Sequence, residues 1–166
     1  MLDELNDDIT FLSFALINND VTPLHTKYLE AFYEEEFDED SALASTQKRP
    51  TIARQQIYAY LARQASPPHD QSTVVETLRS ISKLYSGYVH GASPHIMDMY
   101  VGQPRKFQVA GMLGTEAEDA HRQELTNFFH RTLAASGFAS IACGDAELSN
   151  QVSDFAKEFH RRLGLS

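Results

Sequence analysis

The sequence predicts an all-α fold: a single-domain helical bundle of about six helices that spans residues 1–166. Three observations support this. Apolar residues recur at spacings of three and four along several segments. Prolines and glycines separate those segments. A chain of 166 residues with 42% hydrophobic content can bury one proper core. No internal repeat, low-complexity tract or linker divides the chain.

The first three helices are expected over residues 2–18, from 23 to about 36, and from about 51 to 65. Acidic residues fill the first turn of the first helix, as the helix dipole favours. Thr22 and Pro23 begin the second helix, because a proline costs nothing at the first helical position. Pro67 and Pro68 end the third. The apolar stripe expected on the first helix consists of Leu5, Ile9, Leu12 and Leu16.

A fourth helix over residues 72–90 is expected at the centre of the bundle. Its apolar arc covers roughly half the circumference, which is wider than a surface helix needs. We therefore expect it to be buried against several neighbours, with Ser72 as N-cap and Gly91 as C′ residue. The apolar arc consists of Val74, Val75, Leu78, Ile81, Leu84, Tyr85, Tyr88 and Val89.

The opposite side of this helix carries a polar stripe, formed by Glu76, Arg79, Lys83, Ser86 and His90. Two interpretations stay open. The stripe is either a solvated edge or a cationic groove that ends in His90, whose imidazole is suited to proton transfer.

The C-terminal part predicts a short helix after Pro94, an irregular loop over residues 102–114 with a weak strand signal, and two longer helices. A capping box of Thr115 and Glu118 begins the first of these, which Gly137 ends or kinks. Asp145 caps the last helix and Gly164 follows it as C′ residue. The side chains expected inward are Leu125, Phe128, Phe129, Leu133, Leu148, Val152, Phe155, Phe159 and Leu163.

Composition limits the classes of function. The net charge of −9 disfavours broad nucleic-acid binding, which needs a basic surface. Cys143 is the single cysteine, so no internal disulfide forms and a reducing, cytoplasmic location is expected. No apolar run could span a membrane, and the acidic N-terminus does not resemble a signal peptide. No cofactor is expected.

The histidines invite a test for a metal site. His90, His95 and His121, with Asp98 or Glu124, have suitable ligand types. Their spacing matches no helical metal motif, so no metal is expected, and His121 is interpreted as a buried, hydrogen-bonded residue. No nucleophile elbow, phosphate loop or dinucleotide fingerprint occurs.

One segment supports a family resemblance. Residues 84–91, LYSGYVHG, resemble the YxxYVH segment at a helix end in bacterial HEPN-like domains. The resemblance implies a helical bundle that is often dimeric, and many such proteins cleave RNA as toxins or defence components. Catalytic members have four to six residues between an Arg and a His, whereas ten residues separate Arg79 from His90 here.

Our leading hypothesis is a helical interaction module that self-associates, as a homodimer, or binds another protein. The sequence leaves open whether it is an enzyme. One alternative is a metal-independent ribonuclease in which His90 is the acid–base group and Arg79 and Lys83 hold phosphate. RNA is a partner only in that case. Another alternative is a small-molecule pocket around His90, His95 and His121. The binding residues expected across these hypotheses are Ser86, His95, Tyr100 and His121.

Overall fold

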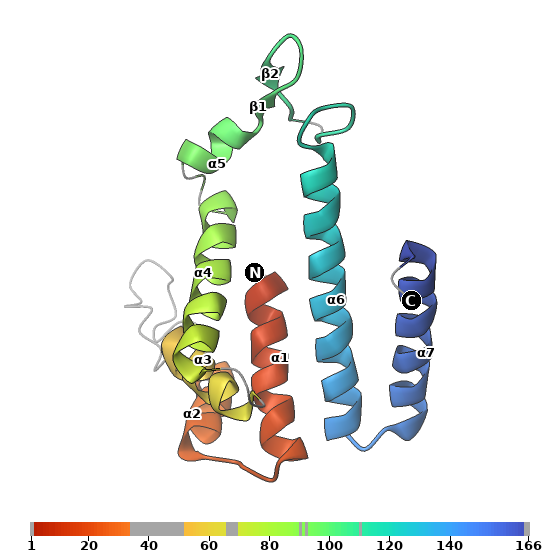
Figure 1. Ribbon diagram of the computed structural model, residues 1–166. Coiled ribbons are helices and arrows are strands. Elements are labelled where there is room, and N and C mark those ends of the chain that lie inside the picture. The colour runs from red at the N-terminus through yellow and green to blue at the C-terminus, as the bar shows by residue number, and fades with distance from the viewer. Residues whose placement is uncertain are drawn as a thin grey trace, which may run out of the picture.

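The computed structural model describes residues 2–33, 52–65, 70–89, 91, 93–109 and 111–164, and it confirms the all-α fold. These residues form seven helices and one small two-stranded hairpin, in which Tyr100 pairs with Phe107 (Figure 1). The elements are α1 (Leu2–Ile17), α2 (Pro23–Tyr33), α3 (Arg54–Gln64), α4 (Gln71–Val89), α5 (Ser93–Asp98), β1 (Tyr100–Val101), β2 (Lys106–Phe107), α6 (Glu118–Ala142) and α7 (Ala146–Leu163).

Helix α1 occupies the centre of the bundle. It lies between α6 on one side and the α3–α4 pair on the other, while α7 lies at the outer edge against α6 (Figure 1). The hydrophobic core forms where α1 meets α3, and its buried members are Phe11, Ile57, Tyr60 and Leu61. The ring of Phe11 stacks on His25 at 4.1 Å and meets Tyr60 edge-on at 5.2 Å.

The central position predicted for residues 72–90 is therefore wrong. None of the described side chains of α4 is fully buried, and Leu84 is exposed. Leu78 packs against the edge of the core, and α3 is the principal neighbour of α4. A wide apolar arc indicates several neighbours, but here the arc is covered mainly from one side. The helix also begins one residue early, because Asp70 rather than Ser72 accepts the Thr73 N–H at 3.0 Å.

The stripe predicted for α1 is wrong at both ends. Leu5 and Leu16 are exposed, whereas Asp3, Asn6, Asp7 and Phe11 are buried. A helix that is enclosed from two sides buries more than one stripe, so polar positions become interior as well. This is the main departure from the fold expected.

Helix α6 runs through Gly137 and ends at Ala142, before Gly144 with φ +70°. Gly137 faces α7, where a Cβ would lie 3.8 Å from Val152, so this glycine belongs to a helix contact. Leu125 was expected inward but is exposed, and Phe129 is partly exposed. The capping box is altered: Glu118 accepts the N–H of Gly114 at 2.7 Å, not that of Thr115.

The signals at both ends of α7 are confirmed. The Asp145 carboxylate accepts the Leu148 N–H at 2.9 Å, and Gly164 adopts the left-handed conformation that ends the helix. Gly91, two positions after the last residue of α4, likewise has a positive φ of +63°. The predicted end of the second helix, near residue 36, lies outside the described residues.

Candidate functional site

The cationic part of the polar stripe on α4 is open to solvent. Arg79 lies 3.8 Å from the carboxylate of Glu76, and 71% of its side chain is exposed. Lys83 is exposed as well, one turn further along α4. Pairs of this kind contribute little to stability. These two cations form a solvated helix edge in the part of the chain that the structure describes.

The other predicted site residues are dispersed. Ser86 is half-buried on α4, His121 is half-buried in α6, and Tyr100 lies on β1 with its ring 5.0 Å from Phe107. His90 lies outside the described residues. The backbone of His95 is part of α5, but its side chain also lies outside the description.

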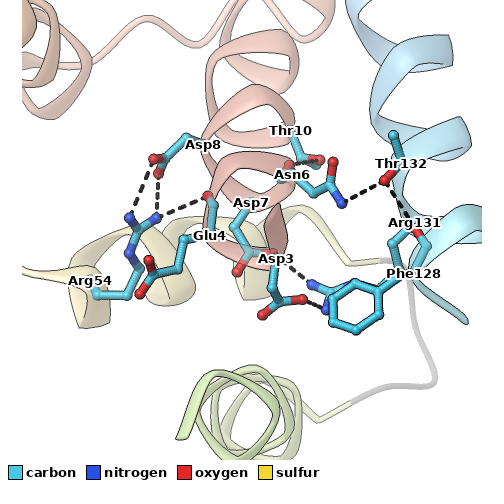
Figure 2. A network of polar contacts seen from close by, with 10 residues as sticks. All are labelled: Asp3, Glu4, Asn6, Asp7, Asp8, Thr10, Arg54, Phe128, Arg131 and Thr132. Carbon is cyan, nitrogen blue, oxygen red and sulfur yellow. Dashed lines mark hydrogen bonds and ion pairs between the residues drawn. The ribbon is translucent and has the colours of Figure 1, made fainter. Parts of the chain in front are cut away.

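A buried ionic cluster lies on α1, where the sequence suggested only an acidic first turn. Arg131 of α6 contacts the carboxylates of both Asp3 and Asp7, and its distance to Asp7 is 2.9 Å (Figure 2). The Asp3 and Asp7 side chains are only 3% and 6% exposed. One half-buried guanidinium thus faces two buried carboxylates. We call Asp3, Asp7 and Arg131 the Arg131 cluster.

Further polar contacts extend the cluster to α3 and along α6. Arg54 of α3 forms an ion pair with Asp8 and also donates to the Glu4 carbonyl at 3.3 Å. Asn6 donates to the Thr132 hydroxyl at 3.1 Å (Figure 2). These contacts fix the register of α1 against both neighbours.

The Arg131 cluster contains two carboxylates but only one guanidinium, so its charges do not balance. Burial raises the pKa of Asp7 to about 7, and the nearby Asp8 and Glu4 carboxylates add to this effect, while Arg54 opposes it. The Arg131 contact also favours the charged form, but that guanidinium is shared with Asp3. The group therefore titrates near neutral pH within the fold.

A sequence signal for this cluster existed. Asp3 and Asp7 are four residues apart, and so are Glu4 and Asp8, which places two pairs of acids on adjacent faces of one helix. Like charges at this spacing repel each other unless a cation lies between them. The signal did not identify the cation, because Arg131 is distant in sequence.

The second prominent feature is the open apolar face of α7. This helix packs mainly on α6, but none of its residues is fully buried. Its Leu148, Phe155 and Leu163 side chains are 45%, 55% and 42% exposed. We call these three residues the α7 ridge. The stripe predicted for this helix exists, but a single neighbour covers only part of it.

Helix α6 continues this apolar surface. The Phe129 ring lies 5.9 Å from that of Phe155 and 4.2 Å from that of Phe159, and Leu125 is exposed one turn away. Elsewhere on these two helices an open groove of about 510 Å³ contains Gly137, Ile141 and other residues, but none of the predicted site residues. The α6–α7 hairpin therefore presents one apolar surface that the rest of the described chain leaves uncovered.

Other chemistry has little support in the described part of the chain. No three His, Cys, Asp or Glu side chains described here are arranged to hold a metal ion. Among the helices that the structure describes, none combines the length and apolar character needed to cross a membrane.

Comparison with protein-family models, with curated proteins and with solved structures found no match to this chain. The HEPN-like resemblance stays a hypothesis.

Proposed function

We propose that this protein is a helical interaction module that acts by self-association through apolar faces left open by its own fold. The observation that carries the proposal is the imbalance of apolar side chains. Within the described residues, nine hydrophobic residues are buried, whereas 21 large hydrophobic residues are exposed. Large exposed apolar surfaces are typical of interaction sites.

The α6–α7 hairpin gives the strongest support for this proposal. An amphipathic helix is stabilised mostly by burying its apolar face, and α7 buries none of its residues in the single chain. A second apolar surface would cover the ridge. The ribonuclease alternative depends on Arg79 and Lys83, which are solvated, and no described contact favours it.

The mass in solution tests the proposal. We expect light scattering and sedimentation to report a dimer whose dissociation constant rises at least about 100-fold in Phe155→Glu, because a buried aromatic contributes about 2–4 kcal/mol at an interface. The matched control is Phe32→Glu, the same change at a phenylalanine that is 66% exposed on α2. A strictly monomeric wild type at high concentration would contradict self-association.

A further inference from the structure

We infer that two copies of this chain pair through α7 in antiparallel orientation about a two-fold axis near Phe155 and Ala156, so that two α6–α7 hairpins form a four-helix bundle. This inference deepens the proposed function and rests on it. It specifies the surface of contact, the relative direction of the two α7 helices and the residues that meet. The occupant of the α7 ridge is a second copy of this chain.

The apolar stripe of α7 is symmetric about a point near the middle of the helix. Leu148 and Leu163 are equally far in sequence from the midpoint between Phe155 and Ala156, and so are Val152 and Phe159. An antiparallel pair of identical helices brings residues at equal distances from the midpoint together. Leu148 of one copy would thus meet Leu163 of the other, while Val152 and Phe159 already pack on α6 within each copy.

The two ends of α7 carry opposite charges. Glu147 lies in the first turn of α7, and His160, Arg161 and Arg162 lie in the last turn. Glu158 already binds both arginines, which leaves this end of the helix with a positive charge. Antiparallel pairing places the acidic start of each helix beside the basic end of its partner, and it opposes the two helix dipoles. Parallel pairing would place like charges together.

The α6–α7 hairpin also has the shape that a four-helix bundle requires. Figure 1 shows α6 and α7 side by side, with α7 at the edge of the molecule and α1 on the far side of α6. Bundles of this type are formed by two such hairpins whose apolar stripes meet along a common axis. A partner can approach α7 without displacing α1.

Disulfide trapping in the full chain tests the orientation. In a Cys143→Ser background we would purify Leu148→Cys and Leu163→Cys, oxidise each alone, and oxidise an equal mixture that was first exchanged under reducing conditions. In an antiparallel pair, the two copies of position 148 are about 22 Å apart, beyond the reach of a disulfide. We therefore expect a covalent dimer only in the mixture. Far-UV circular dichroism checks that each variant folds.

The other outcomes are separable. Covalent dimers of Leu148→Cys alone would establish parallel pairing and overturn the inference. A dimer by light scattering without a crosslink in any sample would place the interface elsewhere, which overturns the inference and leaves the proposed function intact. A monomer by light scattering at high concentration would overturn both.

Discussion

The pKa of Asp7 gives a quantitative prediction about stability. Asp7 is buried beside Arg131, and its pKa of about 7 in the fold compares with an ordinary value of 3.8. Between these two values the folded chain binds a proton at Asp7 that the unfolded chain releases. Stability therefore falls as pH rises through this window, by at most about 1.4 kcal/mol for each pH unit. Over the whole window the loss amounts to at most about 4 kcal/mol.

The substitution Asp7→Asn removes this dependence, because the amide keeps the shape and stays neutral. We expect the variant to be more stable than the wild type at pH 8, by up to about 4 kcal/mol, and nearly equal to it at pH 4. Urea unfolding followed by circular dichroism at fixed protein concentration measures the difference at each pH. Taking the difference cancels the titration of the other groups.

Asp119→Asn is the control, because this exposed acid in the first turn of α6 is far from the Arg131 cluster. Its effect should be below about 1 kcal/mol and should show little pH dependence. A stability difference between Asp7→Asn and wild type that stays constant from pH 4 to 8 would refute the reasoning. So would an Asp7→Asn protein that is less stable than wild type at pH 8, since the Arg131 contact would then outweigh burial.

Three further predictions concern the core, a histidine and the rival function. Phe11→Ala should lower the free energy of unfolding by about 3–5 kcal/mol, because it empties the centre of the core, whereas Phe155→Ala should cost far less in a monomer at low concentration. The imidazole of His25 should titrate below its ordinary pKa of 6.5 in an NMR titration, because burial lowers that pKa. Its protonation should therefore destabilise the fold at acid pH; an unshifted titration would contradict this. Labelled RNA should stay intact with the wild type, and cleavage that is lost in His90→Ala would favour the ribonuclease alternative.

The local signals in the sequence predicted the helices well. Proline at position 23 and the caps at Asp145 and Gly164 act within a turn or two of backbone, so their physics is contained in neighbouring residues. The same signals misplaced the N-cap of α4 by two residues, because Asp70 and Ser72 are both good caps and tertiary context chose between them. The presence of the helices was therefore predictable from the sequence, whereas their exact first and last residues were less so.

The sequence did not predict which helix occupies the centre of the bundle. The candidate site was misplaced for that reason. The apolar arc of α4 is wider than that of α1, yet α1 is enclosed because α6 carries Arg131 and Thr132, which accommodate polar groups on α1. Such a match joins residues more than a hundred positions apart, and periodicity within one helix contains no information about it. The site expected beside α4 depended on a central position that α4 does not have.

In this chain several polar groups are buried, whereas many large apolar groups are exposed. The interior of the single chain encloses Asp3 and Asp7 beside one guanidinium, and replacing such a buried ionic group by apolar residues often costs a fold little stability. Apolar groups that would stabilise a larger core, including Phe155 and Leu148, lie outside. Part of the hydrophobic free energy still available to the described fold is therefore at the surface of α6 and α7, where contact with another molecule would release it.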